Sequence, residues 1–318
     1  FWLVGFTSAT HDIAADGYYM LALTEHQQSL YVGIRSTFYR IATVAGQGLL
    51  VILAGAIEES SGNIPFAWSV VFGILSVMSL VFAFYHSRIL PKVEQTSARP
   101  LTTANDVWRE FIAVFSEFFR KKQVGVAIVF MLLYRLPEAQ LVKLINPFLL
   151  DPPTAGGLGL STGQVGIAYG TVGIIGLPLG GIIGGITAAR RGLKFWLRPM
   201  ACSMSLTCLT FVYLSFANEP SLAVVNICVF IEQFGYGFGF TAYMLYLIYF
   251  SEGRHRTAHY SICTGFMALG MMLPGMAAGW IQETIGYQNF FIWTMICCVA
   301  TIGVTYLIKI NPEFGKKA

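Results

Sequence analysis

Apolar runs about as long as a bilayer is thick recur along nearly the whole sequence, and no other feature limits the fold as strongly. A helix needs about 20 mostly apolar residues to cross a membrane. Hydrophobic residue types make up 55% of the 318 residues and charged types only 11%, whereas soluble domains carry about 25% charged residues. This composition excludes soluble globular, disordered, fibrous and nucleic-acid-binding proteins. It predicts an all-α polytopic integral membrane protein.

The apolar runs predict nine membrane spans, each bounded by polar residues, proline or glycine. The predicted spans are residues 2–23, 29–57, 64–86, 123–149, 163–188, 195–217, 222–250, 257–285 and 288–310. Because nine is an odd number, the two ends of the chain are expected on opposite sides of the membrane. All six cysteines fall inside these apolar stretches. Neither a disulfide framework nor a zinc site is therefore expected.

Basic residues gather on alternate connections and so predict an orientation. Sixteen of the 20 Lys and Arg lie in residues 87–122, 189–198, 251–256 and at the C-terminal end. The other connections carry acidic residues but no Lys or Arg. The positive-inside rule then predicts a cytoplasmic C-terminus. Phe1 starts outside in an apolar run that has no initiator Met and is not a signal peptide, so we expect a chain truncated at its N-terminus.

The first three predicted helices repeat the last three without a gap, at an offset of 224 residues that pairs Tyr19 with Tyr243. Further matched positions are Met20-Leu21 with Met244-Leu245, Gly46 with Gly270, Ala54-Gly55 with Ala278-Gly279, and Glu59, Gly62 and Phe66 with Glu283, Gly286 and Phe290. One register that holds through three helices and two turns indicates duplication. Both copies start outside, so the repeat is parallel, about an axis normal to the membrane.

The repeat predicts how the whole chain is organised. The partner of residues 123–217 would lie before residue 1, so three helices are expected to be missing. With them the protein has twelve helices in two bundles of six, and it resembles the major facilitator superfamily in this architecture. Residues 1–86 would then be helices 4–6 of the N-terminal bundle, residues 87–122 a cytoplasmic linker, and residues 123–318 the C-terminal bundle of helices 7–12.

The predicted linker has two parts. Residues 91–106 are polar and rich in Pro, Ser and Thr, which is typical of a flexible connection. Residues 107–122 place apolar and charged side chains at helical spacing, which predicts a short amphipathic helix on the cytoplasmic surface. The simpler alternative is that this segment only straps the two bundles together.

Ionisable residues inside predicted spans are costly and therefore mark candidate functional sites. Asp12 and Asp16 lie four residues apart on one face of the first span. One of them can carry a proton, because burial and a like-charged neighbour raise a carboxyl pKa; the alternative is a structural partner for a buried arginine. Arg40 lies deep in the second span and shares a stripe with Gln47. It is a candidate for binding an anionic substrate or for pairing with either aspartate.

The span 123–149 is the most polar one and is interrupted by Pro137. Arg135 and Glu138 lie three residues apart and can neutralise each other. Lys143 would then remain unpaired, which favours a position lining a watery cavity. Further along the chain, Glu232 is either a second proton site or the counter-ion of Arg135 or Lys143.

Two other patterns do not predict a catalytic or metal site. Gly176, Gly180 and Gly184 repeat every four residues and predict a close helix contact. His255 and His259 form an H-x-x-x-H pair, but the glutamate of zinc proteases is absent between them. Metal binding is therefore not expected at this pair.

Several short segments carry family-specific patterns. Residues 8–18, SATHDIAADGY, resemble the signature S-A-[ST]-Q-D-I-x-x-D-A-[WY] of AmpG-type muropeptide permeases of the major facilitator superfamily. Residues 134–136, 157–166 and 232–237 are similar to corresponding family segments. The turn at 185–194 is similar to the superfamily loop G-x-x-x-D-[RK]-x-G-[RK]-[RK], but Ala189 stands at the position of the aspartate and Leu193 at a basic position. The charge relay of that loop is therefore in doubt in this half.

The resemblance implies proton-driven import of anhydro-muropeptides across the bacterial inner membrane for cell-wall recycling. These ligands are N-acetylglucosamine linked to anhydro-N-acetylmuramic acid, with or without peptide. The expected partners are this small-molecule substrate, protons and the bilayer; no cofactor, metal or nucleic acid is expected, and the protein is expected to be a monomer. The proton-coupling candidates are Asp12, Asp16 and Glu232. The substrate-binding candidates are Arg40, Arg135, Glu138, Lys143, Gln233, Tyr19, Tyr134 and Tyr243.

Three alternatives stay open at this point. The related acetyl-CoA transporters share much of the pattern, so the first alternative is a transporter of another anionic metabolite. A membrane-embedded transferase acting on a lipid-linked substrate would need a nucleophile or acid-base cluster and a catalytic loop. The longest connection, residues 87–122, offers neither, so no enzyme is expected. The third alternative is a sensor or scaffold that does not transport.

Overall fold

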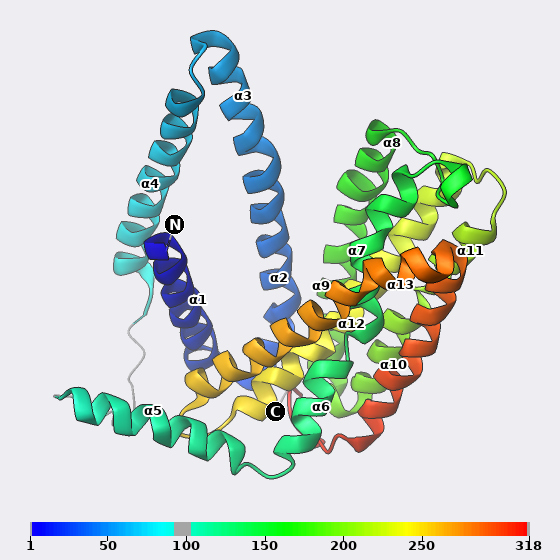
Figure 1. The fold of residues 1–318 in the computed structure, drawn as a ribbon. Coiled ribbons are helices and arrows are strands. Elements are labelled where there is room, and N and C mark those ends of the chain that lie inside the picture. The colour runs from blue at the N-terminus through cyan, green and yellow to red at the C-terminus, as the bar shows by residue number, and fades with distance from the viewer. Residues whose placement is uncertain (1, 92–102, 317–318) are drawn as a thin grey trace. The chain divides into compact units, whose positions relative to one another are not determined.

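The structure, a computed structural model, describes residues 2–91 and 103–316, and this part of the chain is helical and contains no strand (Figure 1). This confirms the predicted all-α class. Within these ranges the side chains of Arg40, Val44, Gln47, Gly48 and Ala104 lie outside the description. The predicted linker at 91–106 also falls largely outside the described residues.

The helix boundaries follow the predicted spans closely. The α-helices are α1 (Trp2–Ala22), α2 (Glu25–Val44), α3 (Leu50–Ser61), α4 (Ile64–Ile89), α5 (Ala104–Phe119), α6 (Val124–Leu133), α7 (Leu136–Leu150), α8 (Thr162–Ile167), α9 (Ile174–Arg191), α10 (Leu193–Leu206), α11 (Leu209–Phe216), α12 (Leu222–Ser251) and α13 (Arg256–Leu307). A 3-10 turn, η2 (Pro153–Ala155), and two π-helical segments, η1 (Ala45–Leu49) and η3 (Ala168–Gly173), complete the chain. Several predicted spans therefore contain two successive α-helices, which are joined by a π-helical segment or by a few irregular residues.

Six helical segments of the described residues are long and apolar enough to cross a membrane. They are residues 64–89, 124–150, 162–191, 193–216, 222–251 and 256–307. The last segment is 52 residues long and is broken at Gly286, whose φ of 75° and ψ of 168° are not helical. It therefore holds both of the predicted spans 257–285 and 288–310. Helix α1 and the α2–α3 rod are not among the six.

The described residues form two compact units, 2–34 with 103–316, and 35–91. In the smaller unit, α3 packs against α4. The turn between them is set by Gly62, which adopts a left-handed conformation with φ of 64°, and by Asn63, whose side chain accepts a hydrogen bond from the Phe66 amide. The predicted division of the chain at residues 86 and 122 stays a prediction.

In the larger unit, the turn between α1 and α2 docks on the turn between α12 and α13. Arg256 donates from Nη2 to Oε1 of Gln28 at 3.0 Å and from Nη1 to the Met20 carbonyl at 3.3 Å. Gln28 is fully buried and donates from Nε2 to the Leu23 carbonyl at 2.7 Å. These bonds satisfy carbonyls at the end of α1 that have no partner within the helix.

Glycines give α9 two faces that carry no side chain. On one face, Gly176 and Gly180 lie against the main-chain carbonyls of α12, and a Cβ atom added to Gly176 would lie 2.9 Å from the Phe230 oxygen. On the other face, a Cβ added to Gly185 would lie 2.8 Å from the Leu30 oxygen at the start of α2. The predicted helix contact at these glycines is confirmed, and it holds backbones closer than side chains would allow.

Candidate functional site

A break in the helical rod of residues 124–150 creates the site. Pro137 has no amide hydrogen and cannot bond to the carbonyl four residues earlier, that of Leu133. Helix α6 accordingly ends at Leu133 and α7 begins at Leu136. The released Leu133 carbonyl accepts a hydrogen bond from Oγ1 of Thr301 in α13 at 3.0 Å. Arg135 is thereby held just before α7 with φ of −105° and ψ of 15°, outside both helices.

Arg135 is buried, 7% exposed, and is bound from two helices. Its Nη2 lies 3.0 Å from Oε2 of Glu138 and donates to the hydroxyl of Tyr236 in α12 at 2.7 Å. The guanidinium also lies over the rings of Tyr236 and Phe240, 5.4 and 4.9 Å from their centroids. The predicted neutralisation of Arg135 by Glu138 is therefore confirmed.

One donor of this arginine remains unused. Nε of Arg135 is buried and has no hydrogen-bond partner among the described residues. A buried donor without a partner is costly, so such an atom is expected to meet an acceptor that the protein itself does not supply. Water or an oxygen of a ligand would meet this requirement.

Helix α12 supplies the other wall of the site. Glu232, Tyr236 and Phe240 are spaced by four residues and share one face of the helix. The adjacent Gln233 donates from Nε2 to Oε2 of Glu232 and to the hydroxyl of Tyr169, both at 2.8 Å. Glu232 is 3% exposed. A buried carboxyl, an amide and a phenol thus lie one helical turn from the Arg135 cluster.

Tyr169 and Tyr236 are the site residues that reasoning from the sequence missed. Tyr169 lies in the π-helical segment η3, where the widened turn changes the direction of its side chain. No local sequence signal predicts such a turn. Tyr236 could have been found, because it lies four residues after Glu232 on the same helix face.

Lys143 lies two helical turns beyond Arg135 on α7, and its side chain is exposed. Its aliphatic part lies beside Gly275 of α13, where an added Cβ would be 3.2 Å from Cε. No ion pair of Lys143 is found among the described residues. Its role in lining a cavity stays a prediction.

Tyr134 and Tyr243, two of the predicted substrate-binding residues, pack against each other in this structure. Both are fully buried, and their rings stack on each other with centroids 5.1 Å apart. The Tyr134 hydroxyl donates to the Gly239 carbonyl at 2.9 Å, and the Tyr243 hydroxyl donates to the Met131 carbonyl at 2.6 Å. Both hydroxyl groups thus donate to main-chain carbonyls and join the α6 segment to α12; the predicted role of these tyrosines in substrate binding stays a prediction.

The candidates on α1 have different surroundings. Asp16 is buried, 7% exposed, whereas Asp12 is exposed. Tyr19 donates its hydroxyl to the Gln28 carbonyl at 2.6 Å, so it too is bound to the main chain. The predicted pairing of an aspartate with Arg40 involves a side chain that lies outside the described residues.

Comparisons with known proteins agree with this architecture. Residues 1–252 match the family model described as Major Facilitator Superfamily. The chain is 26% identical over 312 residues to putative transporter AmpG 2 of Rickettsia typhi, and the match covers 96% of this chain and 70% of the relative. It is 24% identical over 313 residues to putative transporter AmpG 4 of Rickettsia conorii, covering 98% and 71%.

A similar match links the chain to an anhydromuropeptide permease of Escherichia coli K12. The two are 22% identical over 314 residues, which is 99% of this chain and 60% of the relative. Helical segments of membrane-crossing length, a polar cluster buried among them and a family match over most of the sequence all lead to one conclusion. The chain belongs to the major facilitator superfamily and is an AmpG-like permease.

Proposed function

We propose that this transporter imports anhydro-muropeptides together with protons across the bacterial inner membrane, as a monomer with a cytoplasmic C-terminus. Membership of the superfamily makes the chain a membrane transporter of a small-molecule substrate. The substrate class rests on the name of the Escherichia coli relative. The observation that carries the proposal is the buried guanidinium of Arg135, which has an unused Nε donor inside the helical bundle.

The cluster offers the groups that an acidic amino-sugar peptide needs. Arg135 can donate from Nε to a carboxylate while Nη2 stays bound to Glu138 and Tyr236. Lys143 supplies a second cation on the same rod, and Arg40 is a third candidate. Gln233 and Tyr169 can exchange their mutual bond for bonds to sugar hydroxyls and amides.

Proton coupling is assigned to acids that change charge during the transport cycle. Asp16 and Glu232 are buried, so their charged forms are disfavoured unless a partner compensates. Asp12 is exposed on the same helix as Asp16 and can exchange protons with water. Loading and release of a proton at these sites would bias the rocking of the two bundles that gives alternating access.

Uptake into proteoliposomes tests the proposal. A labelled anhydro-muropeptide is offered with and without an imposed proton gradient, to the wild type and to Asp12→Asn, Asp16→Asn and Glu232→Gln. The gradient should accelerate wild-type uptake, an uncoupler should abolish the acceleration, and the three variants should lose it. Glu219→Gln, in the exposed connection before α12, is the matched control.

Two results would overturn parts of the proposal. Uptake that ignores the gradient in the wild type, and that is unchanged in all three variants, would exclude proton coupling through these acids. Uptake of a coenzyme A thioester in preference to the muropeptide would keep the transporter class and reject the substrate.

A further inference from the structure

Helix α5 has an apolar face that the rest of the protein covers only in part. Phe118 is fully buried and Val114 is half-buried. Five of the other apolar side chains, called here the outer stripe, are 40–61% exposed: Trp108, Phe111, Ile112, Phe115 and Phe119. Spacings of three and four residues place them side by side along the helix.

Specific contacts fix how α5 is rotated about its axis. Glu110 and Glu117 lie on either side of His255, with carboxylate oxygens 3.5 Å from Nδ1 and 3.4 Å from Nε2. His259 bonds through Nε2 to the Val114 carbonyl at 3.2 Å. The acidic edge of α5 therefore faces the start of α13. The outer stripe cannot turn inward without breaking these contacts.

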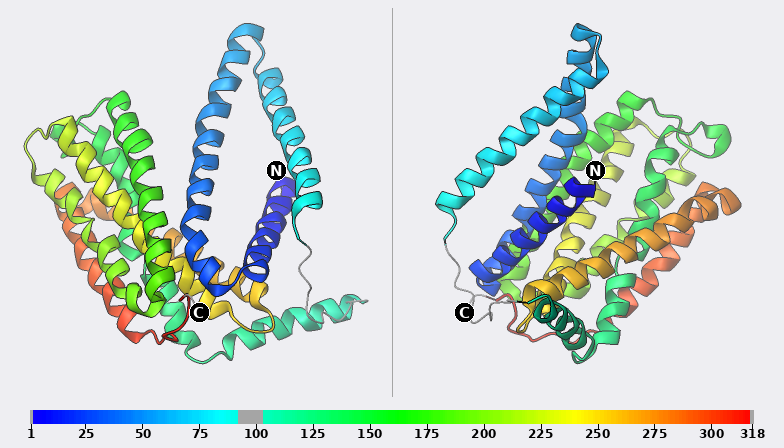
Figure 2. Two further views of the ribbon diagram at one scale, coloured as in Figure 1. Left: turned by 180° about the vertical axis from the view of Figure 1, so that it is seen from behind. Right: turned by 60° about the vertical axis from the view of Figure 1, so that its left-hand side comes forward.

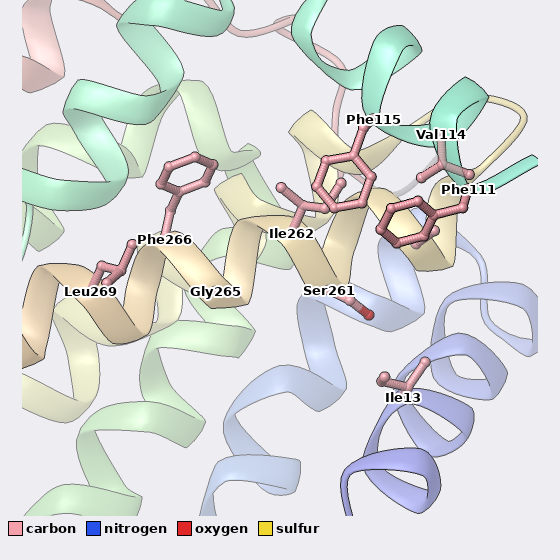
Figure 3. Close-up of a pocket in the computed structure, with 10 residues that line it drawn as sticks. Ile13, Phe111, Val114, Phe115, Ser261, Ile262, Gly265, Phe266 and Leu269 are labelled. Atoms are coloured by element: carbon pink, nitrogen blue, oxygen red, sulfur yellow. The ribbon is translucent and has the colours of Figure 1, made fainter. Parts of the chain in front are cut away.

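Part of the stripe lines an apolar groove next to α13. Phe111 and Phe115 point from α5 toward α13, and the groove of about 590 Å³ between them is also lined by Ile13 of α1 (Figure 3). Ser261 is the single polar side chain among its lining residues. The groove shares no residue with the Arg135 cluster, so it is not a second view of the candidate substrate site.

Basic and acidic side chains lie on different sides of α5. At 100° per residue, Arg109 and Arg120 fall on the border next to Ile112, on the side away from His255. Both arginines and the nearby Lys122 are exposed. The two glutamates occupy the opposite border of the apolar face. The outer stripe is therefore flanked by cations on the side that the protein leaves uncovered.

The position of α5 brings this face to a bilayer. The helix runs crosswise to α6 and α10 (Figure 2), and only four residues separate its last residue, Phe119, from the first residue of the apolar span that starts at Val124. The connection from residue 87 to 122 is also the one that the distribution of Lys and Arg places in the cytoplasm. The apolar phase nearest to the stripe is thus the inner leaflet.

We propose that α5 is an interfacial helix whose outer stripe is immersed in the inner leaflet and whose arginines, Arg109 and Arg120, bind anionic phospholipid headgroups. An aromatic stripe flanked by cations is the composition that favours the boundary between acyl chains and headgroups. Near an anionic surface each arginine contributes about a fivefold preference. Lipid chains then fill the groove beside Phe111 and Phe115.

Spin labels on two positions of the intact protein in nanodiscs test this. Ile112→Cys places a label in the outer stripe, and Ala113→Cys places the matched control on the polar side of the same helix, between Arg120 and Glu117 at 100° per residue. Of the native cysteines five are buried and Cys202 is half-buried, so the unlabelled parent measures the background. Collision rates with oxygen, which partitions into lipid, and with a water-soluble nickel chelate report the surroundings.

We expect an oxygen-to-nickel ratio about tenfold higher at position 112 than at 113, as for an immersed amphipathic helix. Equal ratios at the two positions would overturn the proposal, and so would a label at 112 that neither reagent reaches, since protein would then cover the stripe.

The headgroup part of the proposal has its own test. Adding phosphatidylglycerol to zwitterionic nanodiscs should move the label at position 112 deeper, and Arg109→Gln with Arg120→Gln should abolish this response. A response that survives in the double variant would reject the role of the arginines. Monodisperse elution of each variant shows that it is folded.

Discussion

Helices α1 and α12 occupy equivalent places in the internal repeat but carry different chemistry on the same face. The offset of 224 residues places Asp12 at Tyr236 and Asp16 at Phe240. In α12 these positions are the two rings beneath the guanidinium of Arg135. In α1 they are carboxyl groups. One helix thus presents acids at the positions where the other supports a cation.

The repeat therefore preserves the helix but not the charge of the side chains on this face. If α1 and α12 carried the same side chains at these positions, both helices would present the same charge. Instead, α1 presents carboxyl groups and α12 supports a guanidinium. We therefore expect the acidic ligand to bind near α12 and protons to be carried largely by α1. Three substitutions and one matched control test this comparison of the two helices and their turns.

Arg135→Gln is expected to have the largest effect. It leaves Glu138, which is 5% exposed, without the cation 3.0 Å away. Removing one partner of a buried pair costs about 3–5 kcal/mol, so the apparent Tm in detergent should fall by on the order of 10 °C. The double variant Arg135→Gln with Glu138→Gln should recover much of the loss. A single variant as stable as the wild type would show that α12 does not depend on a cation at this position.

Tyr236→Phe is expected to have a smaller effect, because it removes one hydrogen bond and keeps the ring. The lost bond joins the phenol to a charged donor at 2.7 Å, and such bonds contribute about 1.5–3 kcal/mol. Affinity for the anionic ligand should change as well, since the arginine is released from one restraint.

Tyr134→Phe is the matched control for Tyr236→Phe. It removes a hydroxyl bond of 2.9 Å to a main-chain carbonyl. Binding measured by calorimetry should change in Tyr236→Phe and not in Tyr134→Phe. Equal changes in both would indicate a packing effect alone.

Glu252→Gln is expected to have the smallest effect, and one that depends on pH. Position 252 is the repeat equivalent of Gln28, so the substitution makes the two turns alike. Burial, followed by the neighbouring Glu25 carboxylate, raises the pKa of Glu252 above its ordinary value of 4.5. The folded protein therefore holds this proton more tightly than the unfolded chain, and stability is lost as the pH rises through the raised pKa.

Glutamine imitates the protonated carboxyl group, so the variant should be the more stable protein at neutral pH. The difference should stay below about 1 kcal/mol, since Glu252 is only partly buried and its exposed part is screened by solvent, and should vanish as the pH falls toward 4.5. Thermal unfolding of both proteins across this range measures it. A difference that is constant with pH would exclude titration of Glu252 as the cause.

The sequence predicts the backbone better than the site, for physical reasons. Apolar length and proline or glycine at the ends define where a helix can start and stop, so the break at Pro137 and the turn at Gly286 were predictable. The pair of Arg135 and Glu138 was predictable too, because it is local to one turn. Partners from distant helices were not: the Thr301 bond to Leu133 depends on tertiary packing.

Tyrosine shows the same limit most clearly. Tyr134 and Tyr243 were expected at a ligand because aromatic hydroxyls suit sugars, yet both are used by main-chain carbonyls. Tyr169 was not expected at all, because its direction depends on a π-helical turn. The sequence shows which residue types are available to a site, but not which carbonyl group accepts a hydrogen bond from each hydroxyl.

The bare glycine face of α9 has a further consequence for how the site can vary. Where Gly176 and Gly180 lie against carbonyl oxygens of α12, the spacing of the two helix axes is determined by peptide groups and not by side-chain size. Tyr169 lies on the same rod as α9, so its reach to Gln233 is held by that spacing. Substitutions around Arg135 can therefore change the shape of the site, while the distance between Tyr169 and Gln233 is held by the spacing of α9 and α12.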